Sequence, residues 1–168
     1  MQTIRFNYLN LSREDILLDM GCGEGRHSIG AYIDTQANIL GLDLSMKDLR
    51  IARGRLNDFD ISEIESSCQF GEAAIEAIPI ADSSLDAVIC SEVLEHIDSP
   101  QESIKELIRV LKPGGIIALS VPRFMPELIC WKLSKEYSQT PGGHVRIFKH
   151  RQLKNLGTDN GLEYQSFH

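Results

Sequence analysis

A run of alternating glycines after a short apolar stretch constrains the fold of this chain more than any other feature. Residues 17–28 read Leu-Leu-Asp-Met-Gly-Cys-Gly-Glu-Gly-Arg-His-Ser, so an apolar run ends in an acid, glycines alternate, and a helical pattern begins. Glycine is needed where the backbone takes a positive φ or comes close to a ligand. The stretch therefore predicts a buried strand, a tight turn and a helix N-terminus, with a ligand lying against the turn.

Apolar runs typical of strands alternate with helical patterns along the rest of the chain. We expect strands at 16–20, 38–42, 68–72, 85–90, 116–121 and 162–167, and helices at 25–35, 45–58, 99–111, 123–140 and 150–160. Strands that alternate with helices form a parallel sheet with helices on both faces. We therefore predict an α/β fold, with a Rossmann-like, doubly wound and mainly parallel sheet in three α-β-α layers.

The composition limits the classes of protein to consider. The 168 residues suffice for one domain with a core and are few for two, and 42% of them are hydrophobic. A net charge of −7 argues against nucleic-acid binding, which depends on Lys and Arg at phosphates. Basic residues gather at 146–154, and we interpret them as a solvated helix face. We find no apolar run long enough for a membrane span and no signal peptide.

The four cysteines are spread evenly along the chain and lack the spacing of metal ligands. They are Cys22, Cys68, Cys90 and Cys130. We interpret them as reduced thiols and predict a cytoplasmic protein with no metal site.

Acids follow the predicted strands at the edge where a parallel sheet binds its ligands. Such ligands lie beyond the carboxyl ends of the strands, where the strand order reverses. Asp43 follows the second predicted strand, 20 residues after Gly23. An acid at about this distance can reach the ribose hydroxyls of a nucleoside on the glycine turn. Because Arg26 stands where a dinucleotide-binding motif has its last glycine, the spacing argues against a bound pyrophosphate.

Four segments resemble the class I S-adenosylmethionine-dependent methyltransferases, in particular their small-molecule branch. They are LLDMGCGEGRHS, GLDLS, LDAVICSEVLEHI and ELIRVLKPGGIIALSVP, in the family's order over about residues 14–122. A further segment, GGHVRIFKHRQL, is similar to the region before the last helix of many of these enzymes. The resemblance implies S-adenosylmethionine as the cofactor and methyl transfer to a small molecule as the activity.

The resemblance also implies roles for the residues at the strand ends. Gly21, Cys22 and Gly23 would lie under the methionine part of the cofactor, with Ser91 beside it. Asp19 would orient the cofactor's amino group, directly or through water.

On the nucleoside side, the resemblance implies that Asp43 holds the ribose diol and that Leu44 packs against the adenine. Glu72 and Ala73 would border the adenine edge. The stretch 71–82 is about two residues longer than the family's usual pattern, so either Glu72 or Glu76 could lie nearest the adenine.

Family members usually form a hairpin of a sixth and a seventh strand, and this chain ends at His168, just after the predicted sixth. We expect residues 1–168 to be a single S-adenosylmethionine-binding domain that lacks the last strand, either a fragment or part of a longer protein.

The chemistry of methyl transfer leaves several alternatives open. His96 and His144 are candidates for a general base, each weighed evenly against a structural role, whereas His27 is interpreted as structural. The sequence lacks the motifs for methylating adenine, glutamine or cytosine, which leaves an O-, N- or C-methyltransferase. An apolar lid at 124–137 would suit a lipid-like or aromatic acceptor.

The rival hypotheses are a non-catalytic cofactor-binding module or partner subunit, and a nicotinamide-dependent oxidoreductase. Neither the acceptor nor the oligomeric state follows from the sequence.

Overall fold

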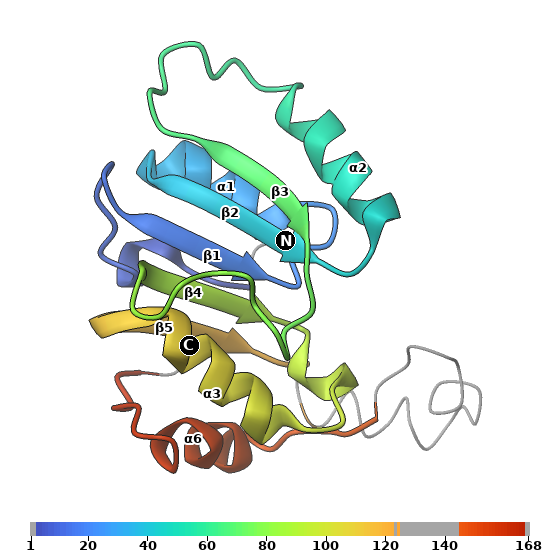
Figure 1. Ribbon diagram of the computed structural model, residues 1–168, viewed down its shortest axis with the longest axis vertical. Helices are drawn as coiled ribbons and strands as arrows, with labels where there is room; N and C mark the ends of the chain where they lie inside the picture. The colour runs from blue at the N-terminus through green and yellow to red at the C-terminus, as the bar shows by residue number, and fades with distance from the viewer. Residues whose placement is uncertain (1–2, 123, 125–144, 167–168) are drawn as a thin grey trace. The chain divides into compact units, whose positions relative to one another are not determined.

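A five-stranded parallel sheet carries the glycine turn (Figure 1). The computed structural model describes residues 3–122, 124 and 145–166. The strands are β1 (Ile16–Met20), β2 (Asn38–Asp43), β3 (Cys68–Glu72), β4 (Leu85–Ser91) and β5 (Leu111–Ser120), in the order β3-β2-β1-β4-β5. The chain passes from β1 outward to β3 and then returns to β4 on the other side of β1, with every pair parallel. This doubly wound order confirms the predicted fold class.

The helices begin close to where the sequence predicts them. They are α1 (Arg26–Thr35), α2 (Met46–Leu56), α3 (Pro100–Val110) and α6 (His150–Thr158), with the short 3-10 helices η1 (Phe6–Tyr8) and η2 (Leu94–His96). Ser45 caps α2, because its hydroxyl accepts a hydrogen bond from the Asp48 amide at 3.3 Å. The sequence analysis predicted neither 3-10 helix.

The start of β5 differs from the prediction because a bulge separates two paired stretches. Leu85 pairs with Leu111, whereas Ala87 pairs with Ile116, so β5 makes room for extra residues between them. Leu111 was expected to end the preceding helix and instead begins the strand. Gly114 takes a φ of 83° in the bulge, a conformation that glycine adopts readily.

The sixth strand predicted at 162–167 is wrong over residues 162–166, which have no regular secondary structure. The Leu162 amide donates to the Gly157 carbonyl at 3.1 Å, and the Lys154 ammonium lies 4.3 Å from the centre of the Tyr164 ring. These contacts hold the segment back against α6, so its alternating pattern does not reflect a sheet. The helix predicted at 123–140 lies outside the described residues except for Phe124.

The chain divides into two compact units. The first contains residues 1–91 and 106–120, and therefore the whole sheet with α1 and α2. On one face of this sheet, the N-terminal segment and α1 pack over β1, β2 and β4. The buried residues of that cluster are Ile4, Phe6, Leu9, Leu17, Ala31, Tyr32, Ala37, Ile39, Ala87 and Ile89. A neighbouring cluster joins α1 and α2 to β3 through Ile29, Leu49, Ala52 and Phe70.

The second unit contains residues 92–105 and 121–168. Within it, the Glu95 carbonyl accepts hydrogen bonds from the amides of Val145 and Arg146, at 2.9 and 3.3 Å. The Arg146 guanidinium donates to the Asp98 carbonyl at 2.7 Å. Over the described part of the chain, no helix combines the length and the apolar character that a membrane crossing requires.

Candidate functional site

The glycine turn between β1 and α1 takes the conformation that its spacing predicts. Gly21, Gly23 and Gly25 have φ angles of 74°, 51° and 80°. The amides of Gly21 and Cys22 donate to the Leu42 carbonyl at 2.7 and 3.0 Å, which ties the turn to the end of β2. The turn therefore lies at the carboxyl edge of the sheet, where β1 has β2 on one side and β4 on the other.

Two glycines of the turn face different surroundings. A Cβ atom on Gly25 would lie 2.9 Å from the Ala52 Cβ and 3.2 Å from the Phe70 ring, so this glycine allows α1 to pack closely against α2 and β3. A Cβ on Gly23 would have nothing within 4 Å. The backbone at Gly23 is therefore open to a ligand, whereas the backbone at Gly25 is covered by the protein.

This difference predicts opposite effects for two substitutions. We expect Gly25→Ala to lower the free energy of unfolding by roughly 2–4 kcal/mol, because it adds both a clash and an unfavourable φ. Gly23→Ala adds strain without a clash, and we expect it to weaken ligand binding more than it lowers stability. Denaturant unfolding and calorimetric titration with S-adenosylhomocysteine measure the two effects.

Gly54→Ala serves as the control for both variants, because Gly54 lies inside α2 and a Cβ there meets nothing within 4 Å. We expect this change to raise the free energy of unfolding by about 0.5–1 kcal/mol. Equal loss of stability in the variants at 23 and 25 would contradict the distinction between them.

Asp43 holds the glycine turn in place and lies at the carboxyl edge of the sheet. Its Oδ2 accepts from the Gly23 amide at 2.7 Å and its Oδ1 accepts from the Ser45 amide at 2.8 Å. A carboxylate has about four lone-pair positions, so each oxygen keeps one for a further donor. The sequence predicted a ribose ligand here, and it did not predict that the same side chain also holds the turn against the start of α2.

Asp19 is a buried carboxylate with one oxygen unused. The residue is 1% exposed, and its Oδ2 accepts from the Ser28 hydroxyl at 2.6 Å. Among the described residues, nothing forms a hydrogen bond with its Oδ1. Loss of solvation raises the pKa of Asp19 to about 6, although the Ser28 hydrogen bonds act in the opposite direction. An unpaired buried oxygen is costly, so Asp19 is well suited to accept from a ligand cation.

Ser28 was missed by the sequence analysis, although it lies in the first turn of α1 and inside the glycine-rich segment. Side chains in the first turn of a helix point back toward the preceding strand. The position of Ser28, two residues after Arg26, was therefore the signal in the sequence that could have identified it.

The residues predicted for the nucleoside side lie at the carboxyl ends of β2 and β3. Leu44 is 63% exposed directly after Asp43, which is unusual for a large apolar side chain beside a charged group. Glu72 pairs in register with Asp43, and the Ala73 amide donates to the Asp43 carbonyl at 3.2 Å. Glu76 lies farther along, in a turn closed by the Ala77 amide. The register thus favours Glu72 over Glu76 as the acid beside a bound nucleoside.

Ser91 lies at the end of β4 in a cluster of hydroxyl groups. Its Oγ is 2.6 Å from the Ser120 Oγ and 2.9 Å from the Thr3 Oγ1. Thr3 in turn contacts His27, which is 4% exposed. Ser120 lies in the segment ELIRVLKPGGIIALSVP, near the end of the strand predicted at 116–121, but was not predicted as a site residue. Thr3 lies outside all of the quoted segments, and nothing in the sequence connected it to this edge of the sheet.

The cysteine at the turn is a buried thiol. Cys22 and Cys68 are free thiols. Burial raises the pKa of Cys22, and it raises the pKa of Cys68 to about 12, so both stay protonated near neutral pH.

The two candidate bases lie outside the first unit. His96 is exposed at the end of η2, in the second unit, and its amide donates to the Val93 carbonyl at 2.9 Å. His144 and the predicted lid, apart from Phe124, lie outside the described residues. Both base assignments therefore stay predictions.

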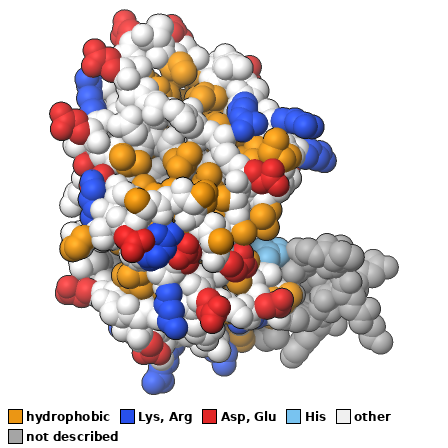
Figure 2. Space-filling model, viewed as in Figure 1, with side chains coloured by type: hydrophobic (Ala, Val, Ile, Leu, Met, Phe, Trp, Pro, Cys, Tyr) orange, Lys and Arg blue, Asp and Glu red, His pale blue; other side chains and the backbone are white. Residues whose placement is uncertain are grey.

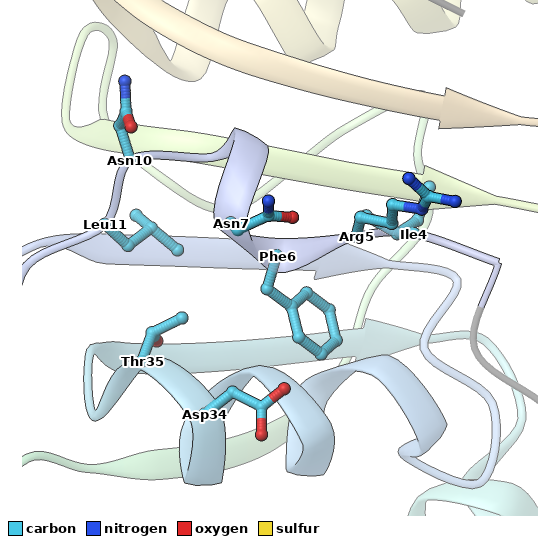
Figure 3. A pocket seen from close by; sticks show the side chains of 8 residues that line it. All are labelled: Ile4, Arg5, Phe6, Asn7, Asn10, Leu11, Asp34 and Thr35. Carbon is cyan, nitrogen blue, oxygen red and sulfur yellow. The ribbon is translucent and has the colours of Figure 1, made fainter. Parts of the chain in front are cut away.

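A groove of about 660 Å³ lies elsewhere in the first unit (Figure 3). It runs between the N-terminal segment and the end of α1, lined by residues 4–7, 10, 11, 34 and 35. Phe6 points toward α1 there. Because Asp34 and Thr35 end the helix that Gly25 begins, this end of the groove lies about 15 Å from the glycine turn.

Comparison with known proteins agrees with this geometry. The family model described as a methyltransferase domain matches residues 18–119, which include most of β1, all of β2 to β4 and nearly all of β5. The chain belongs to the methyltransferase-domain family. A ubiquinone biosynthesis O-methyltransferase of Ralstonia nicotianae is 34% identical over 154 residues, with 88% of this chain and 62% of that protein covered. The chain spans about half the length of the curated relatives it matches.

Two solved structures place this methyltransferase domain among its structural neighbours. A putative methyltransferase in complex with the Trm112 activator of Haloferax volcanii has a TM-score of 0.79 at 21% identity, over 96% of this chain and 67% of that one. The [4+2]-cyclase SpnF has a TM-score of 0.59 at 29% identity, over 65% of this chain and 39% of that one. Proteins named for different activities thus share this fold.

Proposed function

We propose that this methyltransferase domain binds S-adenosylmethionine and transfers its methyl group to the oxygen, nitrogen or carbon of a small-molecule acceptor. One observation carries the proposal. An acid that holds the open glycine turn and a buried acid with an unused oxygen lie two register positions apart on adjacent strands, at the carboxyl edge of the sheet. This arrangement suits a nucleoside joined to an ammonium-bearing chain.

The residues of the site fit such a ligand in both charge and shape. The glycine turn would lie under the methionine part, with the unused Asp19 oxygen accepting from its ammonium group. The free lone pairs of Asp43 would accept from the two ribose hydroxyls. Leu44 would pack on the adenine, with Glu72 and Ala73 at its edge. When bound, the cofactor supplies a methyl group already activated by its sulfonium.

The protein's own contribution to the reaction is then mainly alignment of the acceptor with the methyl group. Alignment of this kind can supply up to about 7–11 kcal/mol. A base is needed only where the acceptor must lose a proton, and His96 and His144 are the proposed candidates. The name of the Ralstonia relative makes acceptors with a hydroxyl group the first to test.

We further propose that the acceptor is a small molecule rather than a nucleic acid. Acidic and basic side chains are interspersed over the face drawn in Figure 2, without the continuous basic surface that phosphates require. The free thiols of Cys22 and Cys68 support the proposed cytoplasmic location. That residues 1–168 act as one cofactor-binding domain also remains our proposal.

Transfer of a labelled methyl group from S-adenosylmethionine to fractions of a cell extract tests the activity. We expect a labelled small molecule with the wild-type chain and none with Asp43→Ala. A chain that binds the cofactor and labels no fraction would instead favour the alternative, a non-catalytic cofactor-binding module or partner subunit.

A further inference from the structure

The hydroxyl cluster at the ends of β4 and β5 includes a residue from far outside the matched family region. Thr3 belongs to the N-terminal segment, which packs over the sheet through Ile4, Phe6 and Leu9. Its Oγ1 lies 2.9 Å from the Ser91 Oγ, 3.3 Å from the Ser120 Oγ and 3.1 Å from the His27 Nε2. Thr3 therefore connects the N-terminal segment to β4, β5 and α1 at one point.

The hydrogen-bond directions in this cluster follow from the backbone of Thr3. Its amide donates to the His27 Nε2 at 3.2 Å, so this nitrogen carries no proton and the ring proton lies on Nδ1. A nitrogen without a proton can only accept, so the Thr3 hydroxyl also donates to it. Because the Thr3 oxygen has then used its proton, it accepts from its nearest hydroxyl neighbour, Ser91.

Ser91 at 2.9 Å lies closer to the Thr3 oxygen than Ser120 at 3.3 Å. The shorter contacts therefore have the Ser91 hydroxyl donating to Thr3 and accepting from Ser120 at 2.6 Å. Every hydroxyl proton of the cluster thus points toward His27, and the lone pairs of Ser91 and Ser120 that remain can only accept. The cluster offers oxygen acceptors at the carboxyl ends of two strands, which suits a ligand with N–H donors.

We propose that Thr3 and His27 are positioning residues that fix the direction of the Ser91 hydroxyl, so that its oxygen accepts a hydrogen bond from the ammonium group of the bound methionine moiety. This inference rests on the proposed function. It makes the N-terminal segment part of the cofactor site, although the family match begins at residue 18. Asp19 and Ser91 would then receive two of the three protons of that ammonium.

Two ligands separate this role from a merely structural one. S-Adenosylhomocysteine carries the ammonium group, whereas 5′-methylthioadenosine has the same nucleoside without the amino-acid part. We expect Thr3→Val to weaken binding of S-adenosylhomocysteine roughly three- to tenfold and to leave binding of 5′-methylthioadenosine unchanged. Thr3→Ser keeps the hydroxyl and is expected to restore binding, while Thr158→Val, which removes a threonine hydroxyl from α6, is the matched control.

A double-variant cycle then tests whether Thr3 acts through Ser91. We expect the Thr3→Val and Ser91→Ala double variant to bind S-adenosylhomocysteine no more weakly than Ser91→Ala alone. Additive losses, equal losses for both ligands, or an unchanged affinity in Thr3→Val would each overturn the inference. Failure of the wild-type chain to bind either ligand would instead reject the proposed function itself.

Discussion

Asp43→Ala is expected to reduce the affinity for S-adenosylhomocysteine at least about 100-fold. Charge-assisted hydrogen bonds contribute about 1.5–3 kcal/mol each, and tenfold in affinity corresponds to about 1.4 kcal/mol. The substitution removes the proposed ribose contacts. It also removes the acceptor of the Gly23 amide at 2.7 Å, so the turn under the ligand loses its support. Calorimetric titration measures the loss.

Two controls separate these causes. Asp60→Ala removes an aspartate that likewise accepts from the amide two residues later, in a loop away from the turn, and we expect it to leave affinity unchanged. A 2′-deoxy analogue of S-adenosylhomocysteine tests the ribose contact directly. The wild-type chain should lose affinity for this analogue, and Asp43→Ala should show no further loss. Unchanged affinity in Asp43→Ala would remove the basis of the ribose assignment.

Binding of S-adenosylhomocysteine is expected to release a proton near pH 6, because an ammonium placed beside Asp19 favours its charged form. Without ligand, burial holds the pKa of Asp19 at about 6, above its usual value of 3.8. The affinity should therefore rise between about pH 5 and pH 7. Titrations in buffers of different ionisation enthalpy count the released protons, and Asp19→Asn should release none from this position.

The same pKa makes a prediction for stability without ligand. Because the folded state holds its proton more tightly than the unfolded state, Asp19 favours folding at low pH. That contribution is lost as the pH rises from about 4 to about 6, by up to roughly 3 kcal/mol. We expect Asp19→Asn to lack this loss, so its stability relative to wild type should increase over that range. A constant difference between the two proteins across pH 4–7 would contradict the assignment.

The parts of the fold that depend on local pattern could be predicted from the sequence. β1 and β4 are buried on both faces, so they read as continuous apolar runs, and the alternate glycines need a positive φ whatever surrounds them. The spacing between Gly23 and Asp43 also predicted their proximity, because a strand–turn–helix–strand unit has a nearly fixed length.

The predictions that failed concern features that depend on contacts between residues distant in the sequence. The apolar spacing of α3 continues to Leu111, and only pairing with Leu85 shows that this residue begins β5. The residues after Gly161, whose alternating pattern predicted a strand, contact α6 instead of pairing in a sheet. Ser28 and Thr3 were not predicted as site residues for the same reason, since their hydrogen-bond partners are 9 and 88 residues away along the chain.

Calorimetric titration of the wild-type chain with S-adenosylhomocysteine and, separately, with NAD tests the central claim most directly. Both ligands contain adenosine, but only NAD has a pyrophosphate, for which the glycine spacing leaves no third glycine. We predict saturable binding of S-adenosylhomocysteine at one site and no binding of NAD. Binding of NAD in the absence of any response to S-adenosylhomocysteine would contradict the account and support a nicotinamide-dependent oxidoreductase.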